Sequence, residues 1–228
     1  WRRHLPPGVR PYAQRAPIGA LLLGISSGFP FAMIGATLTT RLAEADIEKK
    51  AVTAFALAFL MYNFKFLWAP AIDRVRIPVL ANAIGQRRAW LVVVAAAVMA
   101  AVAWLGLANP QTSLSTVVAA TLCVAFAGAT YDIVIDAFRI ETLTPEQLGV
   151  GSGMSQYGWR IGASAAGALA LVIAARAGWS TAYVAATLFA LPAVAAGGLL
   201  GEPVRHAVVK STKRCCAAVS DAVIAPLA

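Results

Sequence analysis

The sequence predicts an all-α membrane protein with six transmembrane helices. Of its 228 residues, 60% are hydrophobic and only 13% are charged, and the mean hydropathy is +0.72. In soluble domains about a quarter of all residues are charged. Uncharged runs long enough to cross a bilayer as helices recur along the chain up to Glu202. These runs are too long for barrel strands, so helices are predicted throughout.

The first two predicted spans lie on either side of a short charged loop. The first lies between Arg15 and Arg41 and contains GALLLGISSGFPFAMIGA. The second lies between Lys50 and Asp73, and only Lys65 interrupts it. Each run exceeds the length that a helix needs to cross the hydrocarbon layer.

The third and fourth predicted spans share one block without a charged residue, from Ala89 to Tyr131. The segment Asn109–Ser113, which reads NPQTS, consists of turn-forming residues. We therefore expect a tight loop at this segment, with one helix before it and one after it.

The fifth predicted span lies between Glu146 and Arg176, with Arg160 as its one interruption, and the sixth lies between Arg176 and Glu202. The segment Thr144–Gln147, which reads TPEQ, has a capping Thr, a Pro at the first helical position and a Gln at the third. This pattern is typical of a helix N-terminus and predicts the start of the fifth span.

Prolines and small residues inside the spans predict where helices bend and where they pack closely. Pro30 in the first span and Pro192 in the sixth should kink or loosen their helices, because proline has no N–H for the helical hydrogen bond. Glycines four residues apart allow helix backbones to pack closely. Two such pairs occur, Gly24 with Gly28 and Gly158 with Gly162.

The distribution of basic residues predicts that both termini are cytoplasmic. With this orientation the inner segments hold thirteen basic residues and the outer loops hold four, Arg41, Lys49, Lys50 and Arg176. We therefore divide the chain into a cytoplasmic N-terminal segment (1–16), a six-helix transmembrane unit (17–201) and a basic cytoplasmic linker (202–228). Two alternatives are open for this linker, an amphipathic helix on the membrane surface or a lead into a further span.

The net charge of +9 does not indicate a nucleic-acid partner, because the basic residues alternate with membrane spans and do not gather on one face. No pairing of a nucleophile with a base is visible, so no enzymatic activity is predicted. The three cysteines and two histidines lack the spacing of a metal site. We expect no metal and no cofactor.

Charged residues inside membrane spans are costly and mark functional positions. The candidates for a substrate or proton pathway are Lys65, Asp132, Asp136 and Arg160. At about 100° per residue, Asp132, Asp136 and Arg139 fall within roughly a 60° arc of one helix. The sequence thus predicts a narrow polar face on the fourth span.

The residues of this face are expected to differ in role. Arg139 and Glu141 lie near the cytoplasmic end, where they would contact headgroups or loop residues. Asp136 can pair with Arg139 three positions away. Asp132 is deeper, so its cation must come from another helix, and Lys65 and Arg160 are both candidates. Asp132 is also the candidate for the acid that gains and loses a proton during proton-coupled transport.

Three motifs resemble one branch of the major facilitator superfamily. KFLWAPAIDR and GQRRAW are similar to the superfamily's loop between helices two and three, with Asp73, Arg74, Gly85, Arg87 and Arg88 at the motif positions. The first glycine of that motif is replaced by Ala-Pro, and the spacing is longer. Together with LGISSGFPF and ATYDIVIDAFRIE, these motifs resemble the AmpG-type muropeptide permeases and the related acetyl-CoA transporter family.

The resemblance implies a fold of two six-helix halves, each made of two inverted three-helix repeats, of which this chain is the N-terminal half. It implies proton-driven import of anionic sugar-peptides, anhydro-muropeptides, across the bacterial inner membrane for peptidoglycan recycling. It also implies that the Asp73–Arg74 loop latches the two halves on the cytoplasmic side.

Two alternatives remain open from the sequence. The first is a major facilitator transporter of another anionic solute or a CoA ester. The second is a six-helix membrane assembly subunit without transport activity, in which the intramembrane charges pair only with one another. The lipid bilayer, the C-terminal half and a small-molecule substrate are the expected partners.

Overall fold

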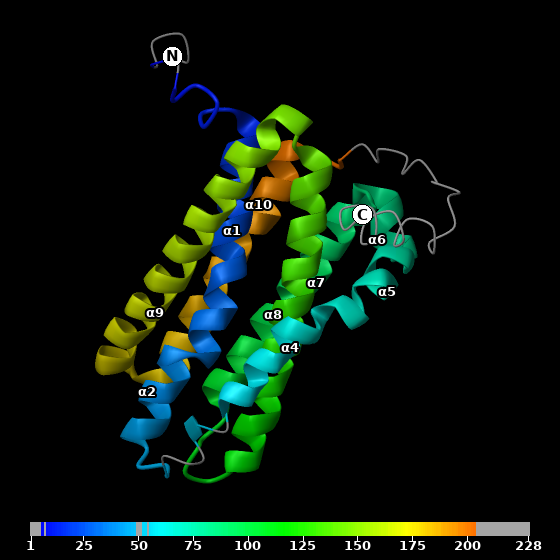
Figure 1. Cartoon of the computed structure of the whole chain (residues 1–228). Helices are drawn as coiled ribbons and strands as arrows, with labels where there is room; N and C mark the ends of the chain where they lie inside the picture. The colour runs from blue at the N-terminus through cyan, green and yellow to red at the C-terminus, as the bar shows by residue number, and fades with distance from the viewer. Residues whose placement is uncertain (1–5, 7, 49–51, 54, 204–228) are drawn as a thin grey trace, which may run out of the picture.

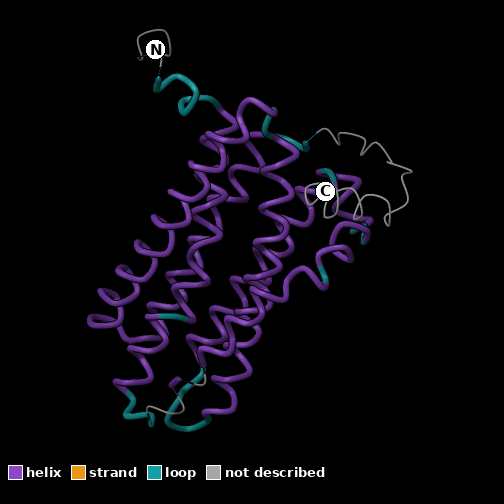
Figure 2. The backbone as a smooth tube through the Cα atoms, in the orientation of Figure 1, coloured by secondary structure: helices purple, strands orange, loops and turns teal. Residues whose placement is uncertain are grey.

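The computed structural model describes residues 6, 8–48, 52–53 and 55–203. In this part of the chain all regular secondary structure is helical (Figure 2). The all-α prediction is therefore confirmed for the described residues. The predicted linker 202–228 lies outside them except for Glu202 and Pro203.

Four helical stretches are long and apolar enough to cross a membrane (Figure 1). They are Arg15–Glu44, which joins α1 (Arg15–Ile34) and α2 (Ala36–Glu44), then α7 (Gln86–Leu107), α8 (Leu114–Thr142) and the long stretch Pro145–Leu200. These stretches support the prediction of a multi-pass membrane protein.

The predicted second span differs from the expected continuous helix. It consists of short helical pieces, namely η2 (Phe55–Phe59), α4 (Leu60–Phe64), η3 (Lys65–Leu67) and α5 (Ala69–Arg74). Pro70 explains the break before α5, because proline cannot donate a helical hydrogen bond and its ring collides with the carbonyl four residues earlier. The short helix α6 (Pro78–Ile84) then leads into α7.

The predicted fifth and sixth spans form one helical stretch that turns back on itself. It comprises η4 (Pro145–Gln147), α9 (Leu148–Ala186), η5 (Thr187–Ala190) and α10 (Leu191–Leu200). A straight helix of these 56 residues would be about 84 Å long, far more than a bilayer needs. The reversal occurs at Gly178, whose φ of 82° favours glycine.

Contacts at both ends confirm this reversal (Figure 1). The indole N–H of Trp179 donates to Oε2 of Glu44 at 2.8 Å, at the end of α2. Leu200 packs against Gly19, near the start of α1. The segment after Gly178 therefore runs back to the end of the bundle where α1 begins.

Two local predictions are confirmed. The backbone N–H of Thr144 donates to Oε1 of Gln147 at 3.2 Å, which forms the expected capping box before α9. The residues just before Pro192 form the 3₁₀ turn η5, where Leu191 N–H bonds the carbonyl of Leu188. Pro192 has no N–H for that carbonyl, so the helix loosens there.

The two glycine pairs meet at one interface, where α1 and the first part of α9 run in the same direction. Gly24 packs against the carbonyl of Ser155, and Gly28 packs against that of Trp159. In return Gly158 and Gly162 contact backbone atoms of α1. Backbone therefore touches backbone, which only glycine permits at this separation.

The centre of the bundle is a packed core. Tyr131 and Tyr183 are fully buried, and their hydroxyls donate to the carbonyls of Ala190 and Met33 at 2.9 and 3.0 Å. Buried Ser26 accepts from the N–H of Ala193 at 2.9 Å. The polar groups of Tyr131, Tyr183 and Ser26 are therefore satisfied inside the core.

Candidate functional site

Three predicted pathway residues come together between α8 and the Lys65 segment. The ammonium of Lys65 lies 3.5 Å from Oδ2 of Asp132 and 3.7 Å from Oδ2 of Asp136. The guanidinium of Arg139 pairs with Oδ1 of Asp136 at 3.0 Å. We call Lys65, Asp132, Asp136 and Arg139 the ionic cluster.

Two serines complete the ionic cluster. The hydroxyl of Ser27, on α1, donates to Oδ1 of Asp132 at 2.5 Å. Arg139 donates to the hydroxyl of Ser152, on α9, at 2.8 Å. The cluster therefore connects α1, α8, α9 and the Lys65 segment. Neither serine was predicted, although the pair Ser26-Ser27 inside an apolar run was a visible signal.

Asp132 is the deepest acid of the ionic cluster, whereas Arg139 lies within one turn of the end of α8. Asp132 precedes the end of α8 at Thr142 by a distance of about 15 Å along the helix. The side chain of Asp132 is 16% exposed, whereas that of Asp136 is 47% exposed. Asp136 therefore reaches water more readily, and Asp132 depends more on Lys65 and Ser27 for stabilisation of its charge.

Arg160 is separate from the ionic cluster. Of the two cations that the sequence offered to Asp132, Lys65 is the partner in the structure. Arg160 is exposed on α9 and forms no ion pair or hydrogen bond with any described residue.

The loop residues form a second network at the end of the bundle where α7 begins. The guanidinium of Arg87 binds Oδ1 of Asp73 at 2.7 Å and Oε1 of Glu141 at 2.5 Å. The carboxylate of Glu202 accepts from the backbone N–H groups of Arg87 and Arg88 at 2.8 and 3.1 Å. Asp73, Glu141 and Glu202, which lie in three separate segments, are thereby each joined to the first turn of α7.

Other predicted residues have different surroundings. Arg74 is exposed and forms no ion pair or hydrogen bond with any described residue of this network. Gly85 caps α7 with a φ of 95°, and a side chain there would collide with the carboxylate of Glu202. Arg139 pairs with Asp136, as their spacing predicted, and it also donates to Ser152.

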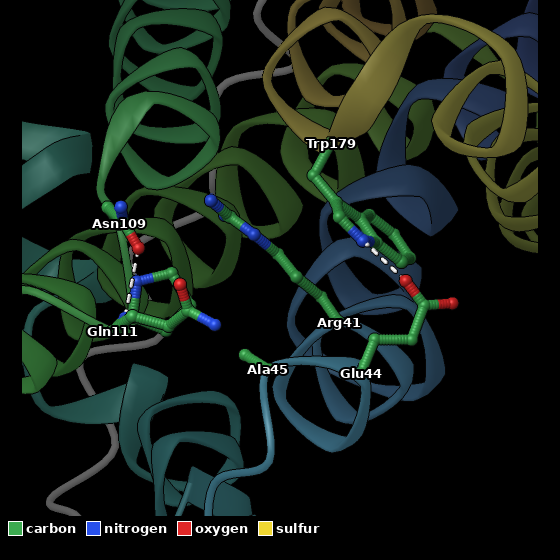
Figure 3. Close-up of a pocket in the computed structure, with 7 residues that line it drawn as sticks. Arg41, Glu44, Ala45, Asn109, Gln111 and Trp179 are labelled. Carbon is green, nitrogen blue, oxygen red and sulfur yellow. Dashed lines mark hydrogen bonds between the residues drawn. The ribbon is translucent and has the colours of Figure 1, made fainter.

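A hollow of about 250 Å³ lies at the opposite end of the bundle, lined by Arg41, Glu44, Asn109 and Trp179 among others (Figure 3). Its main polar groups are already occupied. The guanidinium of buried Arg41 donates to the carbonyls of Leu105, Gly106 and Ala108, at 2.7, 3.1 and 2.6 Å. Arg41 therefore caps the C-terminal end of α7, and we assign it a structural role.

Replacing Arg41 with Met is expected to destabilise the folded protein by about 3 kcal/mol, because the buried carbonyls of Leu105 and Ala108 lose the donor that Arg41 supplies, and the carbonyl of Gly106 keeps only Ser180. Thermal unfolding of the purified protein in detergent measures this loss. Glu44→Gln, in the same hollow, keeps an acceptor for Trp179 and is the matched control. Equal melting temperatures for both variants would contradict the structural role of Arg41.

Comparison with known proteins gives matches over most of the chain. The family model described as acetyl-coenzyme A transporter 1 matches residues 19–200. The chain is 34% identical over 208 residues to the anhydromuropeptide permease of Escherichia coli strain K12, covering 91% of this chain and 40% of that protein. It is 34% identical over 176 residues to putative transporter AmpG 4 of Rickettsia felis, covering 76% and 42% of the two chains. The chain thus spans about two fifths of the length of these relatives.

Proposed function

The chain belongs to the acetyl-coenzyme A transporter 1 family, and from this premise we propose that it is the N-terminal half of a proton-coupled secondary transporter. It spans 40% of the length of the Escherichia coli permease, which leaves room there for a second half. The four long apolar stretches, the reversal at Gly178 and the broken helix around Lys65 are compatible with six crossings of the bacterial inner membrane. The excess of basic residues at one end favours cytoplasmic termini.

The observation that carries this proposal is the shared position of Lys65 between two acids. Its ammonium lies 3.5 Å from Asp132 and 3.7 Å from Asp136, so both carboxylates attract it. When Asp132 takes up a proton it loses its charge, and the attraction between Lys65 and Asp132 falls. The ammonium then favours Asp136. Proton binding thereby changes the contact between α8 and the Lys65 segment, which is the coupling that transport requires.

We propose an anhydro-muropeptide as the cargo, because the Escherichia coli relative is named anhydromuropeptide permease. The family description favours acetyl-coenzyme A as a second candidate. Both are anionic, so the exposed guanidinium of Arg160, which has no ion pair with any described residue, is suited to either. No resident cofactor is proposed, and the coupling ion is the proton.

Uptake by the full-length gene product in proteoliposomes tests this proposal. We expect a pH gradient to drive accumulation of labelled anhydro-muropeptide at least tenfold above the level in vesicles without protein. An uncoupler should remove the accumulation, and unlabelled muropeptide should compete. Uptake blocked by acetyl-coenzyme A but not by muropeptide would favour the second cargo. Accumulation that persists without a proton gradient would contradict proton coupling.

A further inference from the structure

The hydroxyl of Tyr62 is a buried polar group that has no hydrogen-bond partner among the described residues. Tyr62 belongs to α4, which packs against α8 (Figure 1). Its ring lies 5.9 Å from that of Phe31 and 6.5 Å from that of Phe59, centroid to centroid, so aromatic packing holds it in place. Burying a hydroxyl without a partner costs free energy, so its position requires an explanation.

Gly128 of α8 makes room for this hydroxyl. A Cβ at position 128 would collide with the hydroxyl oxygen of Tyr62, and it would lie 3.1 Å from Cβ of Pro30. Asp132 is one helical turn after Gly128, so the two positions are neighbours on one face of α8. Side chains in a helix lean toward its N-terminus, which directs the carboxylate of Asp132 back toward position 128. The hydroxyl of Tyr62 is therefore within reach of Asp132, directly or through one water.

The charged form of Asp132 is stabilised without Tyr62. Ser27 on α1 donates to Oδ1 of Asp132 at 2.5 Å, and the ammonium of Lys65 lies 3.5 Å from Oδ2. Both carboxylate oxygens of Asp132 thus have a partner while the acid is ionised.

Other charged groups near Asp132 come from its own helix. Asp136 on α8 shares Lys65 with Asp132 and pairs with Arg139. On α9, Arg160 has no ion pair with any described residue. A change in the charge of Asp132 therefore acts first on Lys65.

Loss of the negative charge changes what Asp132 requires. A neutral carboxyl carries a proton, and this O–H needs an acceptor when it is buried. Lys65 is a donor only, and its ammonium favours Asp136 once Asp132 is neutral. The phenolic oxygen of Tyr62 is an acceptor that no described residue uses.

We infer that Tyr62 accepts the hydrogen bond of protonated Asp132 and thereby stabilises the proton-loaded form of the transporter. This inference rests on the proposed function, in which Asp132 takes up the proton. The proton binds Oδ2 of Asp132 as Lys65 moves away, and Tyr62 keeps its own proton throughout. Tyr62 is thus a positioning residue whose hydroxyl lacks a partner in one protonation state and gains one in the other.

Infrared difference spectroscopy of the purified full-length protein tests the inference without requiring transport. It follows the C=O stretch of protonated carboxyl groups as the pH is lowered, and the band that Asp132→Asn removes belongs to Asp132. In Tyr62→Phe this band should appear at lower pH, with a midpoint shifted by about 0.5–1 pH unit. The reason is that loss of one hydrogen bond to the neutral acid weakens proton binding roughly 3- to 10-fold.

Two further measurements on Tyr62→Phe accompany the spectra. The pH at which gradient-driven uptake is half-maximal should shift in the same direction. At alkaline pH, where Asp132 is charged, the variant should melt at the wild-type temperature or higher, because phenylalanine removes only an unpaired hydroxyl.

Tyr131→Phe is the matched control, because it removes a buried hydroxyl that has a partner. Tyr131 donates to the carbonyl of Ala190 at 2.9 Å, so this variant should melt a few degrees lower and keep the wild-type midpoint. Gly128→Ala should displace the hydroxyl of Tyr62, so it should shift the midpoint of the wild-type protein but not that of Tyr62→Phe.

An Asp132 band with the same midpoint in the wild-type protein and in Tyr62→Phe would overturn the inference and leave the proposed function intact. An equal shift in Tyr131→Phe would also overturn it, because loss of any buried hydroxyl would then suffice. If Asp132→Asn removes no titrating band, the inference fails whatever the uptake shows. A shifted midpoint in a protein without gradient-driven uptake would contradict the proposed function alone.

Discussion

Asp132→Asn is expected to lower proton-driven uptake by the full-length transporter by roughly 100-fold or more, the effect of removing a positioned proton-transfer group. Asparagine has the shape of aspartate and can still accept the hydrogen bond from Ser27, which is 2.5 Å long in the structure. It cannot take up a proton, and it no longer attracts Lys65 by charge. The variant should therefore insert and fold normally while losing coupling. Uptake with an imposed pH gradient measures the loss.

Exchange of labelled for unlabelled cargo at equal pH provides the control, because exchange requires no net proton movement. We expect Asp132→Asn to retain exchange, which would separate a coupling defect from a folding defect. Asp136→Asn should have a milder effect, since Asp136 is 47% exposed and also pairs with Arg139. Wild-type uptake by Asp132→Asn with an undiminished response to the gradient would refute the assignment of Asp132.

Gly162→Ala is expected to prevent normal packing of α1 on α9. A Cβ at position 162 would overlap the carbonyl of Ile25, and the backbone of α1 cannot yield as a flexible side chain could. Overpacking typically costs about 1–3 kcal/mol, and a clash with backbone belongs at the upper end of that range. We expect a large fall in the yield of monodisperse protein and in its melting temperature.

Gly167→Ala on the same helix is the matched control. At this position the nearest atoms to a new Cβ are Oγ1 of Thr37 at 3.8 Å and Cβ of Ala32 at 3.9 Å, so the methyl group fits in ordinary contact. Alanine is also the better helix former. Gly167→Ala should therefore be neutral or slightly stabilising. If both variants lower the melting temperature equally, the close approach at Gly162 does not explain the glycine pattern.

The resemblance drawn from three short motifs is confirmed by the family match over residues 19–200. The named relatives are a permease and a transporter, which supports the prediction that the chain is not an enzyme. Several residues of these motifs form hydrogen bonds or ion pairs in the structure. Asp73 and Glu141 both bind Arg87, and Ser27 binds Asp132. Three short motifs were therefore sufficient to identify the family.

The predicted second span shows where reasoning from composition was insufficient. Its apolar run was read as one helix, but the structure breaks it before α5, next to Pro70. Hydropathy reports only that a segment prefers an apolar environment. Whether the backbone stays helical throughout depends on local hydrogen bonds, which a proline removes.

The sequence by itself determined the helical class, the membrane composition, the polar face of α8 and the start of α9, because these depend on composition and on periodicity within one segment. Only the tertiary structure decided that Lys65 is the partner of Asp132 and that Arg160 has no ion pair or hydrogen bond within the part of the chain that the structure describes. It also decided that the two glycine pairs face each other and that Arg41 caps α7. Such contacts join residues as far apart as Ser27 and Asp132, 105 positions along the chain. They depend on how whole helices pack, which local spacing does not specify.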